Sequence, residues 1–195
     1  MSRQVAKNGE CLEIIKKSKF IGFCYPINSA NEAKSIIADM EIKYRKANHV
    51  CWAYRVFDSN NILGYSSDAG EPGGSAGPPI LSAIEGRKLI NTLCLVVRYF
   101  GGIKLGVGGL IRAYRGVAAK VLDESGIKIK KPISELTLIT PQKYYSNVMS
   151  LFGKYELEFE QNYRAEDIII NIKIEKSLVE KFKTEFYPLP EIEIK

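Results

Sequence analysis

The chain has 195 residues, of which 46% are hydrophobic and 26% charged, a composition typical of a globular protein with one large domain or two small ones. It has no uncharged apolar run of about 18 residues and no signal-like N-terminus, which excludes a membrane span and a secretory signal and predicts a cytoplasmic protein. Residues 1–131 carry a net charge of +9 and residues 132–195 a net charge of −3. The first part is therefore expected to meet an anionic partner, unless its lysines are simply solvated.

Two strands and a helix are expected at the start of the chain. Residues 10–27 alternate like two strands that separate near residues 16–18. Ser29 and Glu32 have the spacing of a capping box, in which the Ser29 hydroxyl accepts from the Glu32 amide and the Glu32 carboxylate bonds back. This box predicts a helix that ends near Lys43.

The next segment predicts a hairpin. His49–Phe57 has the pattern of a strand, residues 58–61 have the composition of a turn, and Ile62–Tyr65 returns as a second strand. Aromatic residues recur here, and they fit either a buried face or a surface on which RNA bases stack. They are Tyr44, Trp52, Tyr54 and Tyr65.

The four cysteines, Cys11, Cys24, Cys51 and Cys94, lie among apolar residues, and no two form a C-x-x-C pair. They are predicted to be buried thiols in a reducing compartment rather than disulfides or metal ligands. His49 is the sole histidine, which rules out a multi-histidine metal cage and favours a structural or surface role for this residue.

Two glycine-rich loops dominate the middle of the chain, since twelve of the sixteen glycines lie between Gly64 and Gly116. The first loop covers residues 66–79, and a helix is expected from Pro78 or Pro79 to about Leu89. A nearly continuous apolar strand, Thr92–Phe100, has the character of a sheet centre. After the second loop, residues 101–109, a helix is expected over residues 110–123.

The Lys130-Lys131-Pro132 segment marks a domain boundary, with one domain at residues 1–131 and another at residues 132–195. The predicted fold class is α+β. The first domain is expected to be a two-layer α/β sandwich. Beyond the boundary, a β-α-β-β-α-β order predicts a ferredoxin-like domain. Its expected strands are 133–140, 156–163, 167–174 and 192–194, and its expected helices are 143–154 and 177–186.

The second glycine loop and its flanks are the candidate binding site. Glycines let a backbone approach a ligand closely with several N–H groups, and a helix N-terminus adds partial positive charge. The predicted anion-binding residues are Arg98, Gly101, Gly102, Lys104, Gly106, Gly108, Gly109, Arg112 and Arg115. The glycine spacing matches neither a Rossmann nor a Walker motif. A tight turn that packs helix against sheet is the alternative interpretation.

Two acids, Asp68 and Glu71, lie in the first glycine loop. They are expected to organise that loop by accepting hydrogen bonds from its amides. The alternative is that they hold a divalent metal or act as acid and base.

Two blocks of sequence resemble the YigZ/IMPACT family. Residues 68–81, DAGEPGGSAGPPIL, are similar to its D-G-E-P…A-G-x-P-x-L block, with Ala69 as an inserted residue. Residues 96–106, VVRYFGGIKLG, resemble its V-R-Y-F-G-G-x-x-L-G block, and residues 108–114 continue it. The resemblance implies a first domain with the fold of elongation factor G domain IV and a second like its domain V. The family's eukaryotic members act in translational control, through a pathway that bacteria lack.

The expected function is therefore a translation-linked binding protein that contacts RNA or the ribosome through the basic glycine loop, with no cofactor and no membrane partner. One alternative is an enzyme that acts on a phosphorylated small molecule or nucleotide, with magnesium held by Asp68 and Glu71. The other is a protein-interaction module.

Overall fold

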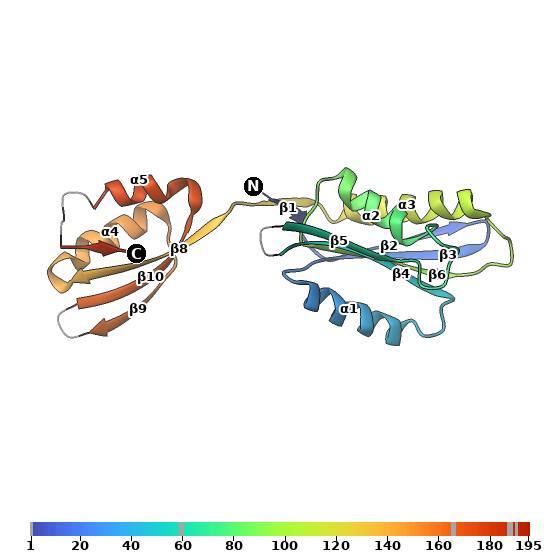
Figure 1. Ribbon diagram of the computed structural model, residues 1–195, viewed down its shortest axis with the longest axis horizontal. Helices are drawn as coiled ribbons and strands as arrows, with labels where there is room; N and C mark the ends of the chain where they lie inside the picture. Colours follow the sequence, from blue (N-terminus) through green and yellow to red (C-terminus); the bar gives the residue numbers. More distant parts are fainter. Residues whose placement is uncertain (1, 59–60, 165–166, 187–188, 190) are drawn as a thin grey trace. The chain divides into compact units, whose positions relative to one another are not determined.

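The chain forms two compact units, one of residues 2–130 and one of residues 131–195 (Figure 1). The computed structural model describes residues 2–58, 61–164, 167–186, 189 and 191–195. The predicted boundary, between residues 131 and 132, lies one residue further along the chain. Each unit is built around its own buried apolar residues, so each is described by itself.

The first unit contains a five-stranded antiparallel sheet in the order β2-β3-β6-β4-β5. Its strands are β2 (Gly9–Ile15), β3 (Ser18–Pro26), β4 (His49–Asp58), β5 (Asn61–Ser67) and β6 (Thr92–Tyr99). A separate antiparallel pair joins β1 (Ser2–Val5) to β7 (Ile127–Lys130). Of the turn expected at residues 58–61, residues 59 and 60 lie outside the described part of the chain.

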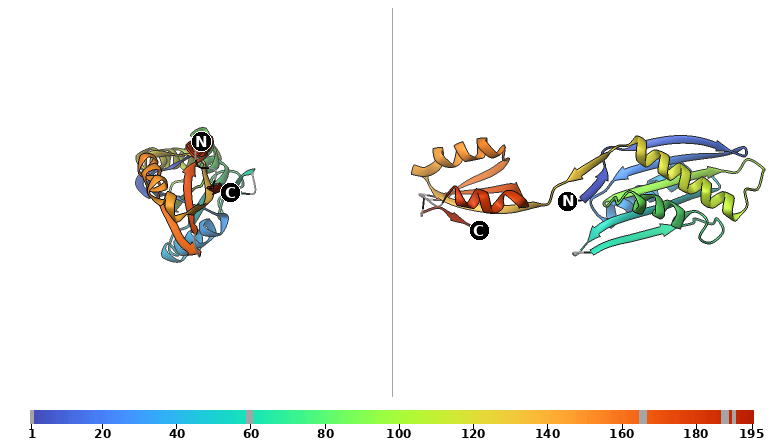
Figure 2. Two further views of the ribbon diagram at one scale, coloured as in Figure 1. Left: turned by 90° about the vertical axis from the view of Figure 1, so that its left-hand side faces the viewer. Right: turned by 90° about the horizontal axis from the view of Figure 1, so that it is seen from above.

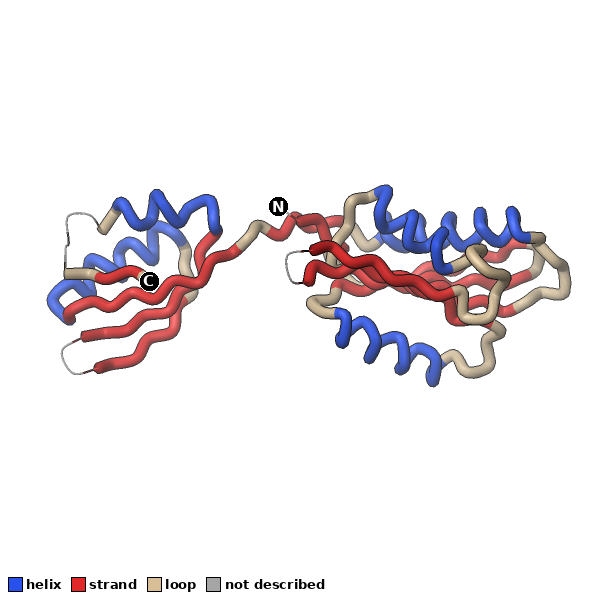
Figure 3. Tube along the Cα trace, viewed as in Figure 1, coloured by secondary structure: helices blue, strands red, loops and turns tan. Residues whose placement is uncertain are grey.

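Helices cover both faces of this sheet (Figure 3). On one face lies α1 (Ala30–Lys43), and on the other lie α2 (Gly77–Gly86) and α3 (Val107–Glu124), which neighbour each other (Figure 2). The α+β class is confirmed, but the unit has three layers where two were predicted. The reason is the apolar composition of β6, whose Leu93 and Leu95 pack on the α1 side while Cys94 and Val96 pack on the α2 and α3 side.

The helix starts follow local chemistry. Ser29 Oγ accepts a hydrogen bond of 3.2 Å from the Glu32 amide, which is the expected cap of α1. The Glu32 carboxylate accepts from the Asn28 amide at 2.7 Å, one residue earlier than the predicted capping box requires. Two side chains, those of Ser29 and Glu32, therefore accept backbone hydrogen bonds at the start of α1.

The second unit has a four-stranded antiparallel sheet in the order β11-β8-β10-β9. The strands are β8 (Ile133–Pro141), β9 (Phe159–Arg164), β10 (Asp167–Glu175) and β11 (Glu193–Ile194). The helices α4 (Tyr145–Tyr155) and α5 (Val179–Thr184) each follow a single 3₁₀ turn and pack on the same face. This order and its one-sided helices make the unit ferredoxin-like, as predicted. None of the described helices is both long and apolar enough to cross a membrane.

Candidate anion-binding site

Asp68 organises the first glycine loop. Its carboxylate accepts hydrogen bonds of 2.8, 2.8 and 2.9 Å from the amides of Gly74, Ala76 and Gly77. Burial by itself raises the pKa of Asp68, but these three amide bonds outweigh it and hold the pKa below its ordinary value. Of the two roles considered for Asp68, this geometry is that of a loop organiser.

Glu71 lies at the centre of a buried polar cluster beneath the same loop. Its Oε1 accepts bonds of 2.7 Å from Arg98 Nη1 and 2.7 Å from the Tyr114 hydroxyl. Tyr114 is fully buried, and this burial raises its pKa far above the ordinary value, so its hydroxyl remains a donor. His49 joins the cluster from β4, with Nε2 3.8 Å from Glu71 Oε1. Its Nδ1 lies 2.9 Å from the carbonyl oxygen of Ala69, a contact that requires a proton on Nδ1.

Hydrogen-bond donors already engage three of the four carboxylate oxygens of the two acids. Both oxygens of Asp68 are occupied by amide donors, and Glu71 Oε1 is occupied by a guanidinium and a hydroxyl. A metal would have to displace these donors and would lie beside the Arg98 charge. Among the described residues, no three His, Cys, Asp or Glu side chains are grouped as metal ligands.

Arg98 is buried, unlike the other cations of the predicted anion site. Its side chain is only 7% exposed and is paired with Glu71, and its guanidinium lies against the rings of Phe20 and Phe100. Arg98 therefore fixes the first glycine loop to β6 and is not presented to a ligand. Arg98 was predicted to bind an anion, and the structure corrects this. A buried guanidinium requires an ionic partner, and Glu71 is that partner.

The second glycine loop packs tightly against the turn between β2 and β3. A Cβ on Gly101 would lie 2.0 Å from the carbonyl carbon of Lys17, so only glycine fits there. The Gly101 amide donates to Ser18 Oγ at 3.2 Å. After this contact the loop turns outward, and both Gly102 and Gly106 have positive φ. The segment thus combines a tight turn at Gly101 with an exposed loop that leads into α3.

The start of α3 leaves main-chain donors free. The helix begins at Val107, three residues before the predicted Leu110, with Gly106 as an N-cap that lacks a capping side chain. The Leu110 amide bonds to the Gly106 carbonyl. No described residue accepts from the amides of Val107, Gly108 and Gly109, as expected for the first turn of a helix. The predicted glycines Gly108 and Gly109 therefore contribute helix amides rather than loop amides.

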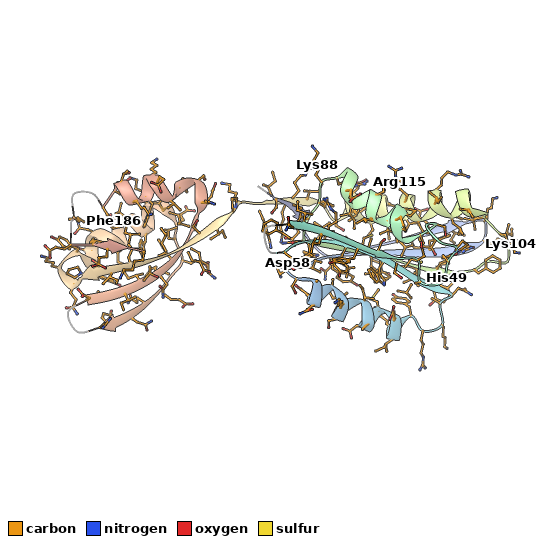
Figure 4. All side chains as sticks on the ribbon, in the orientation of Figure 1. His49, Asp58, Lys88, Lys104, Arg115 and Phe186 are labelled. Atoms are coloured by element: carbon orange, nitrogen blue, oxygen red, sulfur yellow. The ribbon has the colours of Figure 1, made fainter. Side chains whose placement is uncertain are left out.

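Four exposed cations surround this helix start, and we call them the basic surface. They are Lys16, Lys17, Lys104 and Arg112. None forms an ion pair with a described residue. In Figure 4, Lys104 lies at the tip of the unit, whereas Arg115, also exposed, projects from α3 further along the helix. Arg115 therefore flanks the basic surface.

Lys16 and Lys17 were not among the predicted site residues. They occupy the turn between β2 and β3, both with positive φ, and only the packing of Gly101 on this turn brings them to the α3 start. A second signal was present in the sequence itself: residues 86–122 contain seven Lys or Arg and no Asp or Glu. Three of the seven pair with carboxylates outside the stretch, namely Arg87 with Asp123, Arg98 with Glu71 and Lys120 with Glu13, and the other four give this part of the unit its positive potential.

The aromatic residues form a row that is partly core. Trp52 stacks on Tyr54 with ring centroids 5.8 Å apart, and Tyr54 lies 5.1 Å from Tyr65. Tyr54 is buried, while Tyr65 is 45% exposed at the edge strand β5. Tyr44 packs on Phe23 under α1. The row lies on the α1 side of the sheet, away from the basic surface.

Comparison with known proteins places these features in a family. A family model described as the Impact N-terminal domain matches residues 16–122. An IMPACT family member of Haemophilus influenzae is 38% identical over 178 residues, covering 89% of this chain and 84% of its own. The IMPACT family member YigZ of Escherichia coli strain K12 is 34% identical over 145 residues, covering 73% and 71%.

A solved structure described as that of a hypothetical protein extends the similarity to both units. It covers 99% of this chain and 95% of its own at 27% identity, with a TM-score of 0.72. The family model spans all the residues of the basic surface and of the buried Glu71 cluster. The chain belongs to the IMPACT family.

Proposed function

We propose that the chain is a translation-linked, cytoplasmic binding protein that holds RNA, free or within the ribosome, on its basic surface. The observation that carries the proposal is the convergence of four unpaired cations and three free amides at the start of α3. Lys and Arg side chains and helix N-termini are the groups that contact phosphates in nucleic-acid complexes.

The charge distribution favours an extended anion over a small one. Cations without an ion pair to a described residue extend from the β2–β3 turn through Lys104 and Arg112 to Arg115 in the middle of α3. Successive phosphates of an RNA strand match such a distribution, because each cation that meets a phosphate releases condensed counterions. The rigid Glu71 cluster beneath the first glycine loop supports the same face of the sheet without taking part in binding.

Binding should be tested by fluorescence anisotropy with a labelled RNA at several salt concentrations. If all four cations contact phosphates, the affinity falls on the order of 50- to 100-fold between 50 and 200 mM salt. The variant Lys104→Ala with Arg112→Ala should weaken binding and reduce the salt slope by about one to two. An affinity that responds neither to salt nor to this double variant would remove the proposal.

A charge-matched control distinguishes an effect of the basic surface on affinity from an effect of the net charge of the protein. Lys34 on α1 and Lys128 on β7 are both exposed and belong to the same unit. Lys34→Ala with Lys128→Ala removes the same two charges at other places on the unit. This control should keep most of the wild-type affinity, because counterion release depends on the cations in contact with phosphate.

A further inference from the structure

A hollow of about 300 Å³ lies between the β2–β3 turn and the start of α3. Its floor is apolar and consists of Ile15, Leu105 and Ala113. Gly109 also lines it, and the Leu105 side chain packs against this glycine, where an added Cβ would lie 3.0 Å from Leu105 Cβ. The hollow is thus a small apolar depression within the basic surface.

Two cations line the same hollow, Lys16 from the turn and Arg112 from α3. The Arg112 guanidinium lies over the first turn of the helix, because a Cβ on Gly108 would be 3.7 Å from Arg112 Nη1. The nearest carboxylate on β2, Glu13, is paired with Lys120, two helical turns beyond Arg112. Positive charge at the rim is therefore not neutralised by the protein.

We propose that this hollow holds one unpaired nucleotide of a single-stranded RNA, with the base on the apolar floor and its phosphate between Lys16 and Arg112. A base combines a flat apolar body with a phosphate one sugar away, which matches an apolar floor with cations at its rim. A base within a duplex is stacked on both sides and does not present its face to such a depression. The inference rests on the proposed function and adds the class of RNA.

The occupant is a strand rather than a free nucleotide, because the positive charge continues past the hollow. Lys17 lies next to Lys16 in the turn, and Lys104 lies next to Leu105 in the loop. Both are exposed and unpaired among the described residues. A nucleoside monophosphate offers one phosphate to four cations, whereas a strand also supplies the phosphates on either side of a held base.

The test compares two labelled single strands of equal length and charge, one a normal oligoribonucleotide and the other abasic. The wild-type chain should bind the strand with bases about five- to tenfold more tightly. Ile15→Ser should reduce this ratio to below about twofold while leaving the affinity for the abasic strand unchanged. Leu105→Ala, from the other side of the hollow, should act in the same direction. Unchanged abasic binding also shows that each variant is folded.

Ile14→Ser is the matched control, because Ile14 is the neighbouring residue of β2, is 70% exposed and does not line the hollow. Ile14→Ser should keep the five- to tenfold preference for the strand with bases over the abasic strand. Equal binding of both strands by the wild type, or tighter binding of a blunt duplex, would overturn the inference and leave the proposed function in place. Binding of neither strand would overturn both. Displacement of the strand by a nucleoside monophosphate at similar concentration would show a free-nucleotide site instead.

Discussion

Arg98 donates a 2.7 Å hydrogen bond to Glu71 in the interior of the first unit, where the two side chains are 7% and 3% exposed. The bond connects the centre of the sheet to the first glycine loop, because Arg98 lies on β6 and Glu71 lies in the loop. Tyr114 of α3 donates to the same carboxylate oxygen. Three segments that are distant in the sequence thus meet at one oxygen atom.

Removing Glu71 should strongly destabilise the first unit. Glu71→Ala leaves the Arg98 charge buried without a partner, which should lower the free energy of unfolding by about 3–5 kcal/mol. Glu71→Met with Arg98→Met removes both charges and should cost less than the single change. Urea denaturation followed by circular dichroism measures both. A loss below about 1 kcal/mol in Glu71→Ala would contradict the buried pair. Glu13→Gln, at an exposed pair with Lys120, should leave stability nearly unchanged.

Asp68 should make stability depend on pH in the acid range. Its pKa in the folded chain lies below the ordinary value of about 3.9, so its contribution is complete above that value and is lost as the pH falls through the folded pKa. Asp68→Asn should therefore cost about 1–3 kcal/mol at pH 7, and this difference should shrink below about pH 4. Denaturation at a series of pH values measures the difference. Asp39→Asn, on the exposed side of α1, serves as the control, and a difference that stays constant to pH 2 would contradict the role of Asp68.

Alanine substitutions at two glycines should change the stability of the first unit in opposite directions. Gly101→Ala places a methyl group 2.0 Å from the Lys17 backbone, which must move, and should destabilise the unit by about 1–3 kcal/mol. Gly116, inside α3, has open space where a methyl group would lie, with no heavy atom within 4 Å, so Gly116→Ala should stabilise by about 0.5–1 kcal/mol. Thermal unfolding of both variants checks the pair, and equal effects of the same sign would show that the close approach at Gly101 is wrong.

The four thiols should be unreactive in the folded chain. All four cysteines are buried, and burial raises the pKa of Cys51 to about 12, so almost no thiolate is present at neutral pH. A disulfide reagent at pH 8 should label none of them in native protein and all four in denaturant. Ile14→Cys, at a residue that is 70% exposed, should add one fast-reacting thiol as a positive control. Rapid labelling of native wild-type protein would contradict the burial.

The fold could be predicted where the local pattern and the packing agree. The Ser29 cap, the apolar run of β6 and the ferredoxin-like order of the second unit all follow from short stretches of sequence. The pairing of β1 with β7 was not predicted, because it joins two four-residue strands from opposite ends of the first unit. The third layer was missed because the sequence does not say on which face of the sheet α1 packs.

The candidate site was harder to predict than the fold. Lys104 and Arg112 lie where expected, next to the start of α3, because a loop and the helix it precedes are fixed by local chain geometry. Arg98 was misplaced since its direction depends on Glu71, 27 residues earlier, and not on its neighbours. Lys16 and Lys17 lie at the site only because their turn packs against Gly101. No local sequence pattern predicts this contact.

The strand order of the first sheet also bears on how the chain is made. During synthesis β3 can pair with β2 as soon as both have left the ribosome. The other edge of β3 stays unpaired until β6 is made, because Lys19 pairs with Tyr99 and Pro26 with Thr92. At ordinary rates of translation this wait lasts roughly 4 to 14 seconds. During that time the nascent hairpin has an open edge, and the buried side chains of Phe20 and Cys24 lack their cover, because they face α2 and α3, which are made later.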